Sequence, residues 1–493
     1  MIEPGRPGNQ LDFRYPIPIR SSSMFARKPL NVMLSFALVA MAGAAHAAVP
    51  YTTPVLPVGD AQEMTSPYIL AAGWTQKVIA DRTTQNALVA GSNSGSWDMI
   101  DSNRTGVDAN RYLFMPFETG TGGVQRVDLW DTNYNTRTVT IVAPGTQGFK
   151  SGDASRWTPW GSYVTAEESW GTGSTKGRLF EVTNPTTAAA NSGTFIQRSI
   201  IPRVSHEGLA FDANKSMYFV DELNGGSVYK YVSANPNATN GDDYFAAGQT
   251  FALNVGAGGQ FEGNNGPAIT GASSWVAITG VNGGAIAGVS TVLGDGTIDG
   301  RVTADTLNIT SFNRPEDLEM QNLPNGDQLL YFTTTDSDNN GSSADGRGRV
   351  YSTNLTTGVT SLFADNTTID SETGLPVGTP FSNPDNLAIG PDGTIYIIED
   401  QNGGVENIWR TVDANKDGIA ETMSVIATLR TANAESTGMH FIGDKIYVNV
   451  QHPSSGNDVL VEISPVPEAE TYAMMLAGLG LVGFAASRRK SVK

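Results

Sequence analysis

The amino-acid sequence predicts an all-β fold, a six-bladed β-propeller with loop insertions over residues 66–464. Glycine is abundant, at 55 of 493 residues, and Asn, Asp, Ser and Thr recur throughout, which is typical of a chain with many turns. The apolar runs are too short for helices and read as buried strands; they are residues 217–220, 330–332, 395–398 and 446–450. A β-sandwich and a pair of β-domains are the alternatives.

An internal repeat supports the propeller. Three segments place an acidic residue before a leucine, then a turn, then a tyrosine-centred strand that runs into carboxylates; they are residues 206–222, 312–336 and 381–400. Leu209 to Tyr218 and Leu387 to Tyr396 have the same spacing. Weaker copies are residues 160–168 and 435–452. Copies spaced irregularly by roughly 50 to 110 residues suit propeller blades that carry insertions.

Composition excludes several kinds of chemistry. The formal net charge is −18, which disfavours nucleic acid and anionic membrane surfaces as partners. The chain has no cysteine, so disulfides, iron–sulfur clusters and thiol nucleophiles are excluded. It has only four histidines, so a bound metal must rely mostly on oxygen ligands.

The N-terminal region resembles a secretory signal. We expect residues 1–47 to form this region, with the true start at Met24 and a linker over residues 48–65. A basic segment after Met24 precedes an apolar run, Val32 to Ala42, and then Ala45-His46-Ala47, the order of a cleavable signal peptide. A membrane anchor is the alternative, but the apolar run is too short to span a bilayer.

The C-terminal residues 465–493 resemble the PEP-CTERM sorting signal. Val466-Pro467-Glu468-Ala469 precedes an apolar stretch, Tyr472 to Ala486, that we expect to form a helix, and three basic residues, 488–490, follow. Ala469 replaces the usual second proline. The resemblance implies transient membrane association and processing by an exosortase-type machinery; a plain membrane anchor is the alternative. Both ends predict an exported protein that is periplasmic, on the cell surface or extracellular.

Two segments have the alternating oxygen ligands of calcium loops. The first consists of Asp413, Asn415 and Asp417, followed by Gly418, and has Ser424 where an EF-hand loop has its glutamate. The second consists of Asp336, Asp338 and Asn340. A solvated turn is the alternative for each.

A larger set of acidic groups flanks the strand-like runs. Its members are Glu167-Glu168, His206-Glu207, Asp221-Glu222, Glu316-Asp317, Asp385-Asn386, Glu399-Asp400 and Glu435. The innermost strands of a propeller surround its axis, so these side chains can converge there. Burying so many carboxylates without cations is prohibitively costly. We therefore expect metal ligands among Glu167, Glu168, Glu207, Asp221, Glu316, Asp317, Asp385, Asn386 and Glu435.

The order of several short motifs resembles the PhoX-type alkaline phosphatases over residues 100–463. The motifs are residues 160–168, His206-Glu207, Arg314-Pro315-Glu316-Asp317, Pro384-Asp385-Asn386, Glu435 to Gly438 and Val450 to Pro453. The resemblance implies a six-bladed propeller whose axial pocket holds calcium and a pair of iron ions and hydrolyses phosphomonoesters. It makes Arg314 the phosphate-binding residue, Glu207 and Glu316 metal-bridging carboxylates, and Asp385, Asn386 and Glu435 calcium ligands. Arg314 could alternatively pair with Glu316 or Asp317.

One position departs from that family. Ala166 stands where the family has an iron-ligating cysteine, which places the iron pair in doubt but leaves calcium sites intact. We expect a calcium-dependent phosphomonoesterase in which a metal-activated water attacks phosphorus. The alternatives are a lactonase- or phosphotriesterase-like calcium propeller and a non-catalytic, calcium-stabilised extracellular scaffold.

Overall fold

The computed structural model describes most of the chain between residues 62 and 466. The described ranges are 62–88, 91, 95–168, 171, 173–263, 266–335, 348–400 and 405–466, and all belong to one compact unit, Ala47–Lys493. The expected signal region, the sorting tail beyond residue 466 and the loop with Asp336, Asp338 and Asn340 lie outside the described residues. In the described ranges, no helix is both long and apolar enough to cross a membrane.

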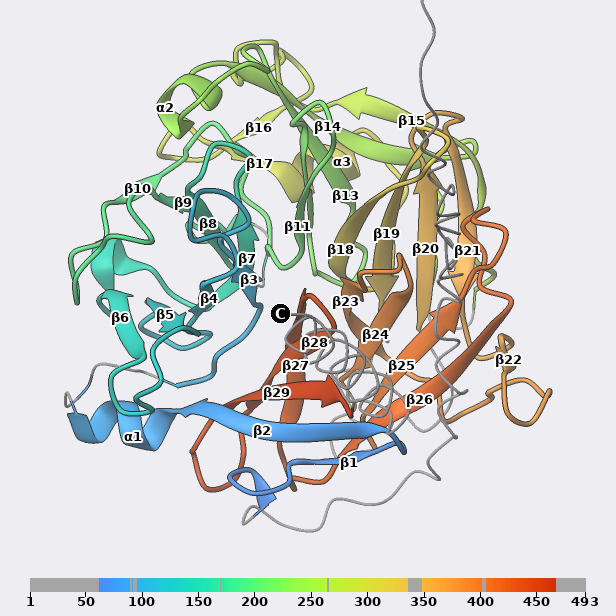
Figure 1. Ribbon diagram of the computed structural model, residues 1–493. Helices are drawn as coiled ribbons and strands as arrows, with labels where there is room; N and C mark the ends of the chain where they lie inside the picture. The colour runs from blue at the N-terminus through green and yellow to red at the C-terminus, as the bar shows by residue number, and fades with distance from the viewer. Residues whose placement is uncertain are drawn as a thin grey trace, which may run out of the picture. The chain divides into compact units, whose positions relative to one another are not determined.

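The fold is all-β, with antiparallel sheets arranged around a common axis (Figure 1). Two of the sheets have four strands that follow one another along the chain. The first contains β3 (Asp101–Ser102), β4 (Tyr112–Pro116), β5 (Val124–Asp128) and β6 (Thr138–Val142). The second contains β7 (Gly152–Trp157), β8 (Tyr163–Glu167), β9 (Leu179–Val182) and β10 (Phe195–Gln197).

A third four-stranded sheet combines the two ends of the described chain. Its order is β2 (Trp74–Asp81), β29 (Val459–Pro465), β28 (Lys445–Gln451) and β27 (Glu435–Ile442). Because β2 pairs antiparallel with β29, with Trp74 opposite Pro465, the sheet ties residues nearly 400 apart in sequence. The next sheet has six strands, namely β23 (Pro384–Ile389), β24 (Ile395–Glu399), β25 (Asn407–Val412), β26 (Thr422–Leu429), β1 (Tyr68–Leu70) and β22 (Ile369–Asp370).

The last large sheet has nine strands. Along the sheet they are β11 (Leu209–Phe211), β12 (Met217–Val220), β13 (Val228–Ser233), β14 (Gly248–Val255), β15 (Gly271–Ala277), β21 (Val359–Ala364), β20 (Arg349–Asn354), β19 (Gln328–Thr334) and β18 (Pro315–Asn322). The expectation of six separate blades is therefore wrong. Four sheets are separate blades, whereas β15 pairs with both β14 and β21 and joins two four-stranded runs into one sheet. The outer strand of a blade has backbone N–H and C=O groups without a partner strand. β15 pairs with the outer strands of both runs, β14 and β21, and so provides these groups with hydrogen-bond partners.

The remaining elements are short. They are α1 (Arg82–Leu88), the 3-10 turn η2 (Thr146–Gly148), α2 (Gly241–Tyr244), β16 (Thr291–Val292), β17 (Ile298–Asp299) and α3 (Gly300–Thr306). The core lies between the faces of neighbouring sheets, in clusters of buried apolar side chains that come from adjacent sheets. The apolar runs expected to be strands are confirmed as β12, β24 and parts of β19 and β28, all buried.

Candidate metal and phosphate site

A β-bulge recurs at the start of three innermost strands. The pairing register shifts by one residue between Gly152 and Ser155 in β7, between Pro315 and Leu318 in β18, and between Pro384 and Leu387 in β23. A bulge inserts an extra residue and re-aims its side chain. The carboxylates inside these three bulges are Asp153, Glu316, Asp317 and Asp385.

A second set of carboxylates follows the strands that pair with the innermost ones. Each member donates its backbone N–H to a residue that precedes an innermost strand. The bonds run from Glu118 to Ser96, Glu168 to Ser151, Glu222 to Ser205 and Asp400 to Asn383, at 2.8–3.0 Å. Thr335 makes the equivalent bond to Arg314, at 3.1 Å. The repeat of the backbone thus carries acidic side chains to equivalent positions around the axis.

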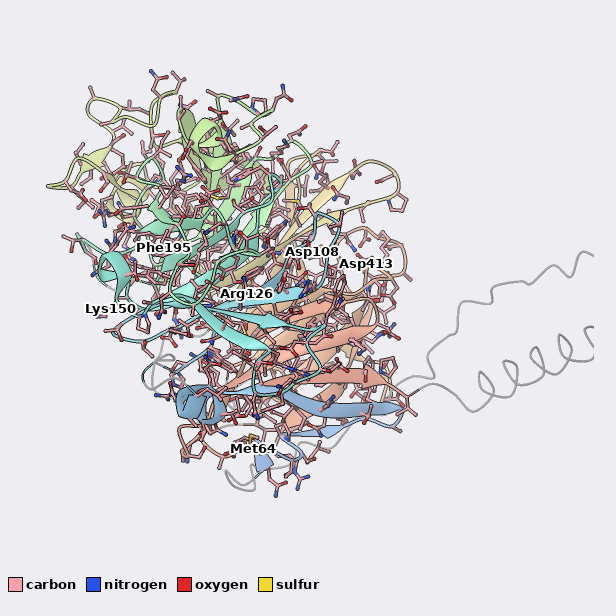
Figure 2. The ribbon with its side chains drawn as sticks, turned by 60° about the vertical axis from the view of Figure 1, so that its left-hand side comes forward. Met64, Asp108, Arg126, Lys150, Phe195 and Asp413 are labelled. Atoms are coloured by element: carbon pink, nitrogen blue, oxygen red, sulfur yellow. The ribbon has the colours of Figure 1, made fainter. Side chains whose placement is uncertain are left out.

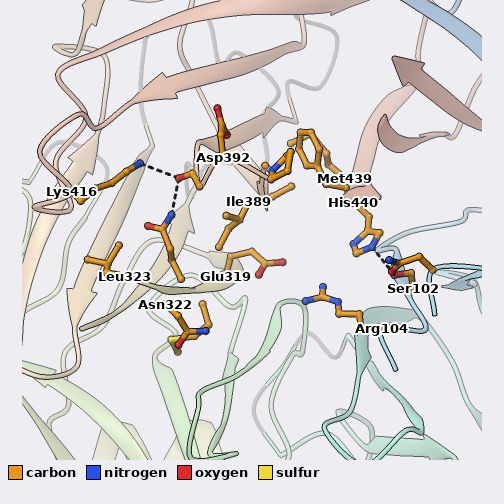
Figure 3. Close-up of a pocket in the computed structure, with 18 of the residues that line it drawn as sticks. Ser102, Arg104, Glu319, Asn322, Leu323, Ile389, Asp392, Lys416, Met439 and His440 are labelled. Carbon is orange, nitrogen blue, oxygen red and sulfur yellow. Dashed lines mark hydrogen bonds between the residues drawn. The ribbon is translucent and has the colours of Figure 1, made fainter. Parts of the chain in front are cut away.

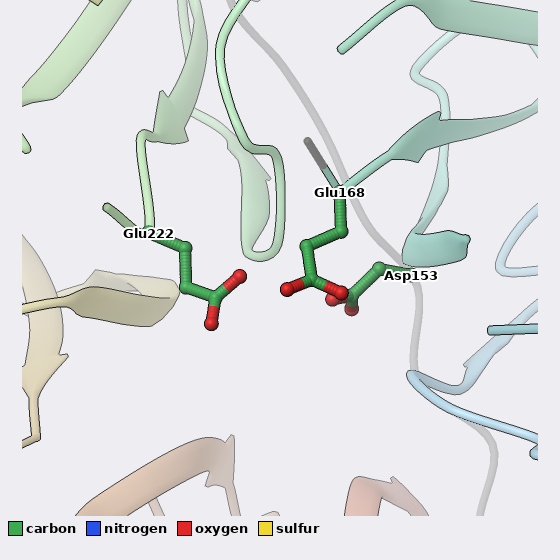
Figure 4. Close-up of side chains that lie close together, drawn as sticks. All are labelled: Asp153, Glu168 and Glu222. Carbon is green, nitrogen blue, oxygen red and sulfur yellow. The ribbon is translucent and has the colours of Figure 1, made fainter. Parts of the chain in front are cut away.

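The described residues contain two groups of three carboxylates whose oxygens all lie within 4.8 Å of one another. Asp153, Glu168 and Glu222 form the first group (Figure 4). Glu207, Glu222 and Glu316 form the second. Glu222 belongs to both, so the groups are adjacent. The convergence of distant acidic residues expected from the sequence therefore occurs for Glu168, Glu207 and Glu316.

Arg314 lies against both groups. Its Nη2 donates to Glu222 Oε1 at 2.6 Å and lies 3.2 Å from Glu316 Oε1. Thr335 Oγ1 donates to the same oxygen of Glu316 at 2.5 Å. Arg314 has a backbone φ of 34°, in the left-handed region, and immediately precedes Pro315. The predicted phosphate-binding residue thus forms the ion pair with Glu316 that the sequence left open, and its guanidinium also contacts the shared carboxylate.

Burial and mutual repulsion raise the pKa values of the acidic residues in these groups. Desolvation, followed by the charge of Glu316, raises the pKa of Glu222 to about 8. Desolvation and neighbouring carboxylates also raise the pKa values of Asp153, Glu168 and Glu207 well above the ordinary range. A nearby cation would remove this penalty, because opposite charge favours the ionised form.

The donor set fits metal ions. Glu222 Oε2, Glu316 Oε2 and Asp153 Oδ1 are buried and accept no hydrogen bond from any described residue. Unpartnered buried oxygens are costly unless an ion or water satisfies them. All the donors are oxygens, the ligand type that hard cations such as Ca²⁺ prefer.

Further acidic residues lie near these two groups. Desolvation is the main cause that raises the pKa of Asp98 to about 7, and it also raises the pKa values of Asp385 and Glu435. After desolvation, the charge of Asp385 helps to raise the pKa of Glu207. Asn386 ties Glu207 to β27, because its Nδ2 donates to Glu207 Oε1 at 3.0 Å while its Oδ1 accepts from Gly438 N at 2.5 Å. Asn386 therefore holds Glu207 in place.

Three sequence-predicted ligands have structural partners instead. Glu167 accepts from Arg178 Nε at 2.8 Å, and Asp221 accepts from Arg301 Nε and Nη2 at 2.9 and 2.7 Å. Asp317 accepts from Leu387 N at 2.8 Å and so ties β18 to β23. Successive side chains at a strand end point to opposite faces, so Glu167 and Asp221 turn away where Glu168 and Glu222 turn inward.

The loop with Asp413, Asn415 and Asp417 lies apart from these groups, between β25 and β26. Asp413 accepts from the backbone N–H of Asp417 and Gly418 at 3.2 and 3.1 Å, and Asn415 Nδ2 donates to Asp417 Oδ2 at 3.0 Å. Figure 2 shows Asp413 on the same side as Asp108, whereas Lys150, which lies just before β7, is on the other side. The loop therefore cannot contribute to the axial site.

Ala166 is fully buried in β8 and packs in the apolar cluster that includes Val164 and Leu179. A methyl group offers no ligand atom, so this position supplies nothing to a metal. Sequence reasoning omitted Asp153, whose segment lacks the leucine that marks the other repeats. Its one signal is a position just after Ser151, a non-glycine residue with positive φ, as are Arg314 and Asn383.

Comparison with known proteins places the chain in a family. The family model for the alkaline phosphatase PhoX matches residues 154–454, more than half of the chain. The chain belongs to the PhoX alkaline phosphatase family. This membership confirms the resemblance drawn from the motif order and, with it, the class of enzyme, a phosphatase-type hydrolase. The PEP-CTERM protein-sorting motif matches residues 465–490, so the sorting signal is confirmed and indicates an exported protein.

Two solved structures align with the chain. Pseudomonas fluorescens PhoX in complex with vanadate, a transition state analogue, aligns with TM-score 0.59 and 14% identity over 84% of this chain and 98% of that chain. The β-propeller domain of Myceliophteria thermophila Cps50 (Swd1) aligns with TM-score 0.35 and 11% identity over 75% and 97% of the two chains. No curated protein matches the sequence. At 14% identity, the first likeness supports the propeller-like fold alone.

Proposed function

We propose that this PhoX family member is an exported, calcium-dependent phosphomonoesterase whose active site is the pair of acidic groups that share Glu222. The contact of Arg314 with that shared carboxylate carries the proposal. It places a planar donor fork, suited to phosphate oxygens, beside the positions where cations would bind.

The two acidic groups support two cation positions. Asp153, Glu168 and Glu222 would hold one cation, and Glu207, Glu222 and Glu316 a second. Asp385 and Glu435 would hold calcium beside these two groups. Calcium is favoured over iron because every donor is an oxygen and Ala166 offers no ligand.

Bound cations would supply positive charge for the phosphate dianion and acidify a water molecule as nucleophile. The protein's own residues would bind and orient the phosphate. Glu222 and Glu316 fix the guanidinium of Arg314, which would donate to two phosphate oxygens. Thr335 holds Glu316, and Asn386 holds Glu207, so that the carboxylates keep their spacing. Burial excludes water from Glu207 and Glu316 and strengthens each of these interactions.

Turnover of p-nitrophenyl phosphate by the purified full chain tests the proposal, with calcium, ferric iron or a chelator added. Turnover that requires calcium supports it. A lactone or a phosphodiester hydrolysed in preference to the monoester would favour the lactonase- or phosphotriesterase-like alternative. Calcium-dependent melting without turnover of any substrate would select the non-catalytic scaffold.

A further inference from the structure

A cavity lies at the other end of the innermost strands. It has a volume of about 560 Å³ and is formed where β18, β23 and β27 end, together with the segment after β3 (Figure 3). β18 carries Glu316 of the acidic groups near its start and lines the cavity from Glu319 to Asn322. Three residues of extended strand, from Glu316 to Glu319, span roughly 10 Å. The cavity shares no residue with the two acidic groups.

A buried arginine contacts the inner wall of the cavity. Arg156 from β7 crosses toward β11 and β18, where its Nε donates to Leu209 O, its Nη2 donates to Leu318 O at 3.3 Å, and its Nη1 lies 2.8 Å from Glu319 Oε1. It is 5% exposed. Arg156 thus holds Glu319 in the cavity wall, and none of the carboxylates of the two acidic groups lines the cavity.

Most of the charges that line the cavity have an ion-pair partner. Arg104 pairs with Asp101 at 2.8 Å, Glu319 with Arg156, and Asp392 with Arg410. Lys416 Nζ donates to the backbone oxygen of Gly393 at 3.3 Å. Burial lowers the pKa of His440 to about 3, so its ring is neutral at pH 7, with Nε2 2.9 Å from Ser102 Oγ. A ligand here therefore faces walls whose net charge is small.

The walls nevertheless offer donors and acceptors on all sides. Figure 3 shows Arg104 and Lys416 on opposite walls, with the carboxylates of Glu319 and Asp392 between them. Asn322 adds an exposed amide at the rim. Apolar side chains separate these polar groups; they are Met320, Leu323, Ile389 and Met439. A ligand that matches this surface carries many groups able both to donate and to accept, attached to an apolar frame.

We propose that this cavity binds a neutral carbohydrate of one or two sugar units. Each sugar hydroxyl both donates and accepts hydrogen bonds, as the alternating cations, carboxylates and amides require. The C–H faces of a sugar ring would pack on Ile389 and Met439. The cavity volume falls within the range of small-molecule sites.

Titration calorimetry and saturation-transfer NMR on the purified full chain, with a panel of neutral mono- and disaccharides, test the proposal. We expect at least one member to bind with a Kd below about 1 mM. Asn322→Trp, which fills the rim, and Arg104→Gln should each weaken binding at least tenfold. Asn135→Trp, an exposed change in the turn between β5 and β6, should leave binding unchanged.

Turnover of p-nitrophenyl phosphate should be the same in all three variants, which separates this site from the phosphatase site. If Arg104→Gln fails to fold because Asp101 loses its partner, Asn322→Trp alone decides. No saccharide binding across the panel overturns the proposal. Binding that survives Asn322→Trp, or that inorganic phosphate displaces, overturns it as well.

Discussion

Replacing the shared carboxylate, Glu222→Gln, should abolish function while stabilising the metal-free protein. Glutamine keeps the shape of the side chain but removes the one negative charge that both acidic groups use. Each proposed cation then loses a charged ligand at once. We expect cation affinity and turnover to fall at least 100-fold, which corresponds to about 3 kcal/mol.

The stability effect has the opposite sign. Burial and the charge of Glu316 raise the pKa of Glu222 from 4.5 to about 8, so its ionisation above pH 8 costs about 5 kcal/mol in the chelated protein. The contacts of Arg314 lower the pKa and are already contained in this net shift. The chelated Glu222→Gln protein should therefore be more stable than wild type at pH 9, by up to about 5 kcal/mol.

Thermal unfolding with chelator at pH 9, calcium titration and p-nitrophenyl phosphate turnover measure the two effects. Asp221→Asn is the matched control, because the adjacent carboxylate pairs with Arg301 and is fully buried. It should destabilise the protein by about 3 to 5 kcal/mol and leave calcium affinity intact. A Glu222→Gln protein that keeps calcium affinity and turnover within threefold of wild type would refute the reasoning.

Three further predictions concern single features. Arg314→Lys should keep the charge beside Glu222 but lose the fork, so KM for p-nitrophenyl phosphate should rise at least tenfold with calcium affinity unchanged; an unchanged KM contradicts the role. In the chelated protein, burial raises the pKa of Asp98 to about 7 and that of Glu399 to about 8. The stability that these groups contribute when protonated is complete below pH 4 and is lost as the pH rises through 8. The melting temperature should therefore fall between pH 5 and pH 9, and a rise would contradict the reasoning. Asp413→Ala removes two backbone hydrogen bonds of an outer turn and should cost about 1 kcal/mol in stability without changing turnover, whereas a loss of turnover would place that loop in the site.

The sequence predicted the features that repeat. Tyrosine-centred apolar runs became second strands of the sheets because their length and burial demand strands, as Tyr218 in β12 and Tyr396 in β24 show. The meeting of Glu207 and Glu316 also followed from the repeat, because equivalent positions in repeated units face the same axis.

The sequence could not predict which of two adjacent acidic residues points toward the axis. Glu167 and Glu168 differ only by one position in a strand end, and a single added residue in the paired strand decides which of them turns inward. The pairing of β15 with β21 could not be predicted either, because it depends on which sheet edge the segment with β15 lies against. Asp153 lacked the leucine marker and entered only through its bulge.

The most direct test of the account is a crystal structure of the calcium-loaded full chain, with anomalous scattering data that locate the cations. The account predicts two cations that share Glu222 as a ligand, one also bound by Asp153 and Glu168 and the other by Glu207 and Glu316. Cations found only at Asp413, or none within reach of Glu222, would contradict it.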